Sequence, residues 1–510
     1  MDFQLLRHAF ATVLLDPINF LYALSGIVGG ILVGALPGLT ATMGCALLIP
    51  FTFGRPPIQG LLMLIGIFCG GIYGGSISGI LIRTPGTPAA AATLLDGHPL
   101  TQQGMGGKAI GMATIASFFG GTIGALIMTF LSPQIAKIGL KFGPAEFFAL
   151  AFFGLGMIIT VSGRSLLKGF ISTLVGLLIA TIGFDPLSGV ARFTFGSRDL
   201  LGGVTFIPAL IGLFGYAQVF RNIEKITTLP TVKAKVAHIL PKWSEIRAVL
   251  GTMVKSSLMG TFIGSVPGTG CDVAAFVAYG EAKRSSKHPE KFGTGILEGI
   301  AAPESANNAA TGGAMIPMLT LGVPGDAVTA VLLGALTIHG LQPGPMLFRD
   351  HLDVVYPIFA GMIMAQLALL IVGLAGARLF ARIINVDRRI LTPVIFFLCV
   401  VGSYSMRFSF FDVGLSLAIG FIAYFMEYYD YPASPILLAL ILGPMAEQNL
   451  RRALIIAHGD PLVFFKRPIS ATLIGVAVFM MISSYYRIKK AMEREEAEQR
   501  AALTDNVNAE

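Results

Sequence analysis

Charged residues are scarce in this sequence. Asp, Glu, Lys and Arg make up 13% of its 510 residues, whereas a typical soluble domain contains about 25%. Cysteine is also rare, and the four cysteines form no CxxC or Cys/His cluster, which excludes a disulfide framework and a zinc site. Together with a hydrophobic content of 54%, the shortage of charge excludes an ordinary soluble protein and predicts a membrane protein.

Long apolar runs are what the sequence has instead. Several reach the roughly 20 residues that a helix needs to cross the hydrocarbon core of a bilayer, so we predict an all-α polytopic membrane protein. The net charge of +8 comes from basic residues scattered through short connections, which is typical of cytoplasmic loops and does not indicate nucleic-acid binding. The predicted spans cover residues 19–36, 61–82, 110–131, 147–161, 166–183, 201–220, 355–379, 393–402, 413–426, 436–443 and 469–485.

Proline and glycine interrupt the apolar runs at four places. The sequence contains 62 Gly and 28 Pro, which membrane helices tolerate where they break inside the protein or pack closely. Each interruption contains a Pro-Gly pair and is followed by a short apolar run, such as 43–53, that cannot span alone. We therefore predict broken helices and re-entrant hairpins. The pairs are Pro37-Gly38, Pro85-Gly86, Pro267-Gly268 and Pro324-Gly325.

The order of these interruptions repeats along the chain. Gly30-xxx-Gly34-xx-Pro37-Gly38 recurs 230 positions later as Gly260-xxx-Gly264-xx-Pro267-Gly268. Gly74-Gly75 followed by Pro85-Gly86 is echoed by Gly312-Gly313 followed by Pro324-Gly325, at an offset of 238 to 239. Paired broken helices in corresponding halves are typical of transporters with a binding site near the membrane midplane.

The repeat predicts a division of the chain into four parts. Residues 1–220 form the first transmembrane repeat, and 221–247 form a basic cytoplasmic linker. Residues 248–486 form the second repeat with extra helices, and 487–510 form a charged, soluble tail. Residues 1–16 lack a signal-peptide cleavage site, and we expect an interfacial helix there that ends at Asp16-Pro17.

The breaks are the predicted binding site. Backbone N–H groups at the start of a half-helix favour an anion, and unwound carbonyls favour a cation. Hydroxyl groups flank each break and can donate to a carboxylate or accept from a cation shell. The predicted substrate-binding residues are Pro37, Gly38, Leu39, Thr40, Thr42, Thr84, Gly86, Thr87, Pro267, Gly268, Thr269, Gly270, Asp272, Pro324, Gly325 and Asp326.

A second polar cluster lies in the run from Ala302 to Gly313. Glu304 is a carboxylate in apolar surroundings, and such an intramembrane carboxylate is by default a functional hypothesis. Asn307 and Asn308 favour a role as ligands or in a fixed polar network. We predict a coupling-ion site, for Na⁺ or H⁺, with no structural metal and no other cofactor. Its candidate residues are Glu304, Ser305, Asn307, Asn308 and Thr311.

Several of these residues have a plainer explanation that stays open. Asp272, Asp326 and Glu304 can each be helix-capping carboxylates. His98 and His339, in loops rich in Pro and Gly, are usually structural, with a proton relay as the alternative. Gly293-Thr294-Gly295 resembles a phosphate loop but follows no strand and supplies no lysine, so nucleotide binding is not expected.

The motifs resemble one family over nearly the whole chain. The sequence is similar to the large membrane subunit of the tripartite tricarboxylate transporter family, the TctA-like permeases. The residues that carry the resemblance are Gly34 to Thr40, Gly264 to Gly268, Pro303 to Ala310, Leu321 to Gly325 and Leu341 to Pro345.

The resemblance implies a multi-pass permease of the bacterial inner membrane. It implies a smaller membrane subunit and a periplasmic solute-binding protein as partners, and import of di- and tricarboxylates such as citrate by symport with Na⁺ or H⁺. It further implies two inverted-topology repeats and an elevator-type carrier. The alternatives are an ion channel and a cation/proton exchanger without an organic substrate. We expect no enzyme, because no nucleophile–base set or metal cluster is evident.

Overall fold

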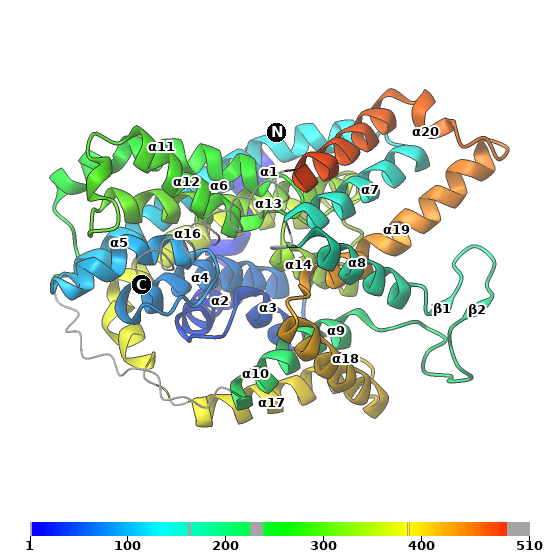
Figure 1. The fold of residues 1–510 in the computed structure, drawn as a ribbon, viewed down its shortest axis with the longest axis horizontal. Coiled ribbons are helices and arrows are strands. Elements are labelled where there is room, and N and C mark those ends of the chain that lie inside the picture. The colour runs from blue at the N-terminus through cyan, green and yellow to red at the C-terminus, as the bar shows by residue number, and fades with distance from the viewer. Residues whose placement is uncertain (1–2, 162–164, 225–237, 385, 387, 487–510) are drawn as a thin grey trace, which may run out of the picture. The chain divides into compact units, whose positions relative to one another are not determined.

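The chain is helical almost throughout, as the sequence predicts (Figure 1). The computed structural model describes residues 3–161, 165–224, 238–384, 386 and 388–486. The predicted soluble tail 487–510 and residues 225–237 of the predicted linker lie outside the described residues. Within the described part, seven helices are long and apolar enough to cross a membrane. The predicted fold class, an all-α polytopic membrane protein, is therefore confirmed.

The first six helices contain the first two predicted breaks. Residues Asp16 and Thr40 cap the helices that follow them with their side chains, which explains where these helices begin. The helices are α1 (Phe3–Leu14), α2 (Pro17–Ala35), α3 (Ala41–Thr52), α4 (Pro57–Ile82), α5 (Ala90–Gln102) and α6 (Gly106–Gly139).

A short hairpin and an irregular helix follow. The hairpin was not predicted, and its two-residue strands pair antiparallel, with Gly183 opposite Arg192. The elements are α7 (Pro144–Val161), α8 (Leu166–Ala180), β1 (Gly183–Phe184), β2 (Ala191–Arg192), α9 (Phe206–Leu210), a π-helical segment (Ile211–Tyr216) and α10 (Ala217–Glu224).

The second part of the chain contains the other two breaks. The helices are α11 (Trp243–Gly264), α12 (Gly270–Ser285), a 3₁₀ turn (Pro289–Lys291), α13 (Glu298–Leu321), α14 (Ala327–Ile338), α15 (Pro345–Asp350), α16 (Leu352–Ile383), α17 (Arg388–Ser405), α18 (Phe410–Tyr428), α19 (Ser434–Ile456) and α20 (Val463–Lys466). A last span covers Pro468–Tyr486.

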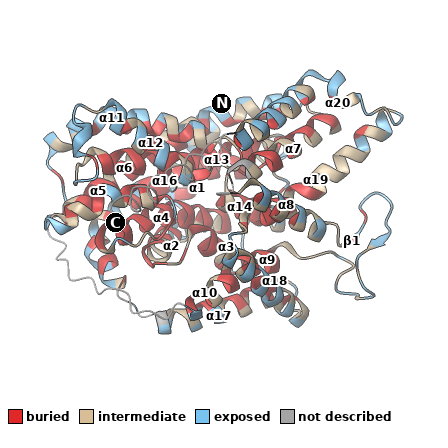
Figure 2. Cartoon of the chain, viewed as in Figure 1, coloured by how far each residue is buried: buried red, intermediate tan, exposed pale blue. Residues whose placement is uncertain are grey.

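By their contacts the helices form two compact units. One comprises residues 1–141 and 204–425, and the other comprises residues 142–203 and 426–510. This grouping by packing cuts across the predicted repeats, which are a division by sequence similarity and stay a prediction. In the first unit, α4 packs on α2 and α16, and α13 packs on α11 and α6. Helices α4 and α13 are buried over most of their length (Figure 2).

Glycine allows the close packing of these helix pairs. A methyl group on Gly30 would overlap the backbone of Ile67, and one on Gly260 would overlap the backbone of Ala306. Gly34 contacts Gly71 in the same way that Gly264 contacts Ala310. The offset is 230 positions between α2 and α11 and 239 positions between α4 and α13.

The contacts correct one detail of the sequence comparison. Gly74 packs against the carbonyl of Ile31, and Gly313 packs against the carbonyl of Thr261, which lies 230 positions after Ile31. Gly74 therefore corresponds to Gly313, and Gly75 corresponds to Ala314. The match of Gly74-Gly75 to Gly312-Gly313 was displaced by one residue, because a run of adjacent glycines has no side chains that distinguish its register.

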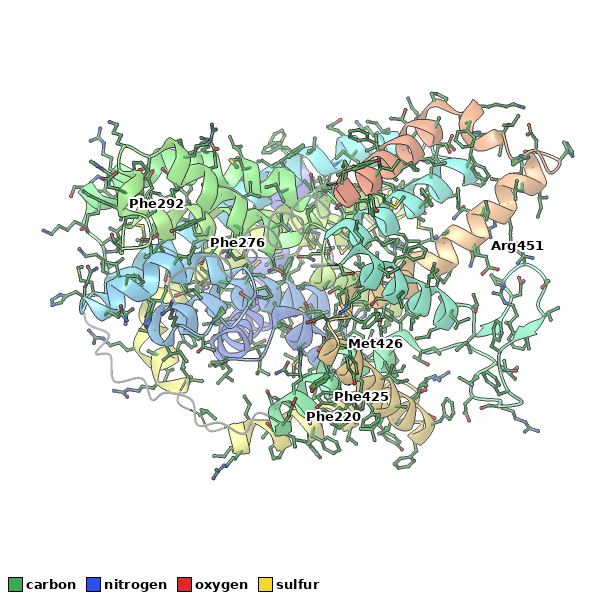
Figure 3. All side chains as sticks on the ribbon, in the orientation of Figure 1. Phe220, Phe276, Phe292, Phe425, Met426 and Arg451 are labelled. Atoms are coloured by element: carbon green, nitrogen blue, oxygen red, sulfur yellow. The ribbon has the colours of Figure 1, made fainter. Side chains whose placement is uncertain are left out.

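In the second unit an ion network joins the hairpin to α19. Asp185, which follows β1 and is 7% exposed, accepts a hydrogen bond from Arg451 of α19 at 2.6 Å. Arg192 of β2 donates to both carboxylate oxygens of Glu447 on α19, at 2.7 and 3.2 Å. Arg451 is labelled in Figure 3. The Arg451 guanidinium holds the pKa of Asp185 well below its ordinary value.

Candidate functional site

The first break in each half is a tight turn at glycine. Helix α2 ends at Ala35 and α3 begins at Ala41, while α11 ends at Gly264 and α12 begins at Gly270. Gly38 has φ +93° and Gly268 has φ +85°, a region that favours glycine. Both breaks were predicted from Pro-Gly, and both are present.

The second breaks share a geometry as well. Helix α4 ends on Arg83 with φ 56°, and α13 ends on Gly322 with φ 73°. After this residue, whose φ is positive, the segment that follows turns back along its own helix. Gly86 then packs against Gly34 and Gly75, and Gly325 packs against Gly264 and Ala314. The two contacts are alike: in both, the second break lies beside the end of the helix that leads into the first break.

Direct contacts bring the four breaks together in one region. The Gly268 N–H donates to the Gly325 carbonyl at 2.8 Å, which joins the third and fourth breaks. Ala89 beside the second break packs with Ala275 of α12, and its N–H lies near the Asp272 carboxylate, which joins the second break to the third. The contact of Gly86 with Gly34 joins the second break to the first. The predicted substrate-binding segments, which are far apart in sequence, are therefore neighbours.

The starts of four half-helices, α3, α5, α12 and α14, lie at these breaks, and they are capped differently. Thr40 accepts from the Met43 N–H at 3.2 Å at the start of α3, and Asp326 accepts from the Thr329 N–H at 2.7 Å at the start of α14. The Thr269 hydroxyl instead donates to the carbonyls of Ile263 and Val266, so no side chain caps α12 in the described structure.

These capping patterns suggest different roles for the predicted residues. Asp326 and Asp272 each place a carboxylate at the start of a half-helix, α14 and α5 respectively, where a negative charge is favourable. The capping explanation left open for both residues therefore has structural support. At the starts of α3 and α12 no side-chain carboxylate caps the first N–H groups among the described residues, although Asp272 itself lies in the first turn of α12.

The remaining threonine hydroxyls at the breaks differ in whether they already have a hydrogen-bond partner. Thr84 donates to the Ile82 carbonyl at 3.4 Å, and Thr42 is buried in the first turn of α3. Thr87 is 3% exposed, and its hydroxyl has no hydrogen-bond partner among the described residues. A buried hydroxyl without a partner is costly unless a ligand or water completes it, so Thr87 is the best placed of the predicted threonines for a substrate contact.

Glu304 lies in a shell of hydroxyl groups. Its carboxylate accepts from Ser76 of α4, from Thr93 of α5 at 2.5 Å and from Ser117 of α6 at 2.8 Å. The glutamate is fully buried. A carboxylate held by hydroxyls, with no cationic partner among the described residues, resembles a site where a proton or a small cation completes the charge.

The asparagines extend this network along α13. The Asn308 amide donates to the Glu304 carbonyl at 3.1 Å and to the Asn307 side-chain oxygen at 2.6 Å. The side-chain oxygen of Asn308 has no donor among the described residues. Thr311 donates to the Asn308 carbonyl at 2.7 Å, and Ser305 donates to the Ala116 carbonyl at 3.2 Å. The predicted coupling-ion residues thus lie on one buried helix with one unused carboxamide acceptor.

Sequence reasoning missed several polar residues near the site. Ser76, Thr93 and Ser117 come from three helices and have no motif that links them to Glu304. Gln366 of α16 is fully buried and donates to the Cys69 sulfur at 3.2 Å. Gln218 of α10 lies against Gly38 of the first break. The one sequence signal for Gln366 is its position as a polar residue inside the long apolar run of α16.

The histidines and cysteines have local roles. His98 contacts the Ile80 carbonyl at 3.2 Å, and His339 contacts the Thr52 hydroxyl at 3.2 Å. Cys271 donates to Asp326 at 3.6 Å, and all four cysteines are free. In the part of the chain that the structure describes, no three His, Cys, Asp or Glu side chains form a group that could hold a metal ion.

Comparison with known proteins agrees with this architecture. The model of the tripartite tricarboxylate transporter TctA family matches residues 20–438. This chain belongs to the TctA family. It is thus a membrane permease subunit of a tricarboxylate transporter, and the family is one of transporters rather than enzymes. The matched range covers all four breaks and both polar clusters.

Two relatives of this TctA-family permease come from Agrobacterium vitis. An uncharacterized 52.8 kDa protein in the TAR-I ttuC' 3' region is 37% identical over 468 residues, which cover 92% of this chain and 93% of the relative. An uncharacterized protein in the TAR-II ttuC' 3' region is 38% identical over 223 residues, which cover 44% of this chain and 92% of the relative. No solved structure matches the chain.

Proposed function

We propose that this TctA-family permease imports di- or tricarboxylates, such as citrate, across the bacterial inner membrane with a Na⁺ or H⁺ gradient. The observation that carries the proposal is the convergence of four helix breaks through the contacts of Gly268 with Gly325, Asp272 with Ala89, and Gly34 with Gly86. Such a site holds an anion reversibly with backbone N–H groups and hydroxyls. Family membership supplies the substrate class.

The substrate carboxylates would bind at the starts of α3 and α12. Among the described residues no side-chain carboxylate caps either of these two half-helices. Asp326 caps α14, and Asp272, although it belongs to the first turn of α12, lies near the Ala89 N–H at the start of α5. The Thr87 hydroxyl, which has no partner in the described structure, would donate to a carboxylate oxygen. Asp272 and Asp326 would then act through charge, because they disfavour an anion that arrives without its cation.

The coupling ion would bind between Glu304 and Asn308. Na⁺ prefers oxygen ligands, and this cluster offers a carboxylate, three hydroxyls and the unused Asn308 carboxamide oxygen. A proton on Glu304 is the alternative, since the same hydroxyls can also accept from a protonated carboxyl group. Both schemes place the positive charge on α13, whose far end leads into the fourth break.

We further propose that the transporter works with a small membrane subunit and a periplasmic solute-binding protein. The matched contacts of α2–α4 and α11–α13 support two repeats, and an inverted arrangement would give a carrier with access from alternating sides. An elevator-type movement is consistent with this plan.

The test is uptake by the purified permease with both partner subunits in proteoliposomes. A panel of mono-, di- and tricarboxylates would be offered with Na⁺ and pH gradients imposed separately. We expect saturable uptake that requires the binding protein and follows one of the two gradients. Ion flux that needs neither a carboxylate nor a partner would contradict the proposal and favour the channel or exchanger.

A further inference from the structure

Asp96 is a buried carboxylate that the proposed transport scheme does not yet use. It lies in the second turn of α5, the half-helix that follows the second break, and its exposed fraction is 0%. One carboxylate oxygen accepts from three backbone N–H groups, those of Gly293, Gly295 and Ile296, at 2.9, 2.8 and 3.0 Å. The other oxygen accepts from the Tyr279 hydroxyl at 2.9 Å.

The loop that binds Asp96 has the geometry of an anion-binding nest. Gly293 and Gly295 have φ values of +90° and +107°, which turn successive N–H groups toward one point. The sequence resembles a phosphate loop at Gly293-Thr294-Gly295, and the structure gives the reason: these N–H groups surround an anion, but that anion is the carboxylate of Asp96. Because the loop leads directly into α13, Asp96 ties α5 to the start of α13.

Tyr279 extends the connection to α12. Its ring packs edge-on against Phe292 with centroids 5.4 Å apart, which fixes the direction of its hydroxyl group. Phe276 of α12 and Phe292 of the loop that follows α12 are labelled in Figure 3. Nearer the breaks, Ala89 and Ala92 pack against Ala275. Helices α5 and α12 are therefore joined near the breaks by apolar contact and farther along by Asp96.

We propose that Asp96 is a positioning residue that clamps α5 to α12 and α13, so that the second and third breaks move as one body during transport. The inference rests on the proposed function, because it assigns a mechanical role within the transport cycle. Charge-assisted hydrogen bonds to backbone N–H groups are stronger than neutral ones, and Asp96 makes three of them from one oxygen. The clamp keeps the start of α5 in a fixed place relative to the start of α12, where the substrate is held.

The first test separates positioning from folding by kinetics in proteoliposomes. We expect Asp96→Ala to raise the KM for the carboxylate about tenfold, because the two breaks lose their fixed spacing. Asp96→Asn keeps an acceptor oxygen for the loop and should restore the KM to within about threefold of the parent. Gln103→Ala is the matched control, since Gln103 donates to the Thr294 carbonyl at 2.8 Å between the same two elements. It should leave the KM unchanged. An unaltered KM in Asp96→Ala protein that folds would overturn the proposal.

The second test asks directly whether α5 and α12 move together. Cysteines placed at Ala92 and Ala275 would be joined by oxidation in membranes, with each single-cysteine variant as the control. We expect the pair to cross-link and the linked protein to keep at least about half of its uptake. Loss of uptake that a reductant restores, or failure of the pair to cross-link, would overturn the proposal. Absence of carboxylate uptake in the parent protein would instead contradict the proposed function. In that case the yield of the cross-link alone would test whether α5 and α12 stay together.

Discussion

At the scale of single residues, α13 carries two carboxylates that hydroxyl groups bind, the buried Glu304 and the half-buried Glu298. Glu304 accepts hydrogen bonds from Ser76, Thr93 and Ser117. Glu298 accepts hydrogen bonds from Thr252 and Ser286, both at 2.7 Å. Both are held by hydroxyls, but only Glu304 is fully buried beside the Asn308 oxygen that lacks a donor. This difference makes Glu304 the candidate for ion coupling and Glu298 a suitable comparison.

The first prediction concerns the charge of Glu304. Glu304→Gln keeps the size of the side chain but removes the negative charge that would attract Na⁺ or carry H⁺. We expect stimulation of uptake by the ion gradient to fall more than about tenfold, while the protein remains folded in the membrane. Uptake under imposed Na⁺ and pH gradients measures the effect, with Glu298→Gln as the control. Full gradient stimulation in Glu304→Gln would remove Glu304 from the coupling site.

The sequence and the structure agree on the breaks for a local reason. Proline and glycine act on the backbone at their own position, so Pro37-Gly38 and Pro324-Gly325 could be located without a three-dimensional model. The partners of Glu304 and Asp96 could not, because Ser117 and Gly293 lie 187 and 197 positions away in the chain. Long-range hydrogen bonds depend on how the helices pack, and a single sequence contains no local signal for that packing.

At the scale of elements, two adjacent glycines of α2 differ in their surroundings: Gly30 packs against α4, whereas Gly29 faces open space. A methyl group on Gly30 would overlap the backbone of Ile67 on α4, whereas one on Gly29 would meet nothing within 4 Å. The tight α2–α4 contact therefore depends on one face of the helix. The α2–α4 contact therefore also fixes the positions of the breaks at the ends of these two helices.

The second prediction follows from this pair of glycines. Gly30→Ala should force α2 away from α4 and destabilise the protein by roughly 1–3 kcal/mol, as overpacking does elsewhere. Gly29→Ala should be neutral or stabilising by up to about 1 kcal/mol, because alanine favours the helix. Thermal unfolding in detergent measures both. Equal stability of the two variants would show that the α2–α4 contact is looser than the structure has it.

The hairpin was the element that the sequence analysis did not anticipate. Its strands contain only two residues each, too few for an alternating pattern to be recognised. Its attachment comes from Asp185 and Arg192, whose partners on α19 are more than 250 positions away. Ion pairs between distant charged residues give no pattern within either segment.

The third prediction is the pH dependence of this attachment. The pKa of Asp185 is lowered in the folded protein, chiefly by Arg451. Its contribution to stability is therefore complete above the ordinary Asp pKa of about 3.9 and is lost as the pH falls through the lower folded value. Asp185→Asn should be less stable than the parent at neutral pH, and the difference should shrink as the pH falls below about 4. Thermal unfolding over a pH series measures it, and a difference that grows with acidity would contradict the assignment.

At the scale of the whole molecule, charge predicts the direction in which the chain crosses the membrane. Lys283 and Arg284 lie in the last turn of α12 and Lys287 and Lys291 in the loop after it, while the corresponding loop after α3 contains only Arg55. Lys108 at the start of α6 pairs with Glu245 at the start of α11 at 2.8 Å and holds the pKa of Glu245 below its ordinary value. The start of α6 therefore lies on the same side as the start of α11, which follows the basic linker.

The last prediction tests inverted topology through these two corresponding loops. Because basic loops remain in the cytoplasm, the loop after α12 should face inward, and an inverted repeat places the loop after α3 on the opposite side. Arg55 and Lys287 are both exposed. In intact spheroplasts a membrane-impermeant maleimide should label Arg55→Cys, but should label Lys287→Cys only after the membrane is opened. The four native cysteines are buried, so the parent protein provides the background. Labelling of both positions from one side would mean that the halves are parallel, and the carrier would then need a different route to expose its site alternately.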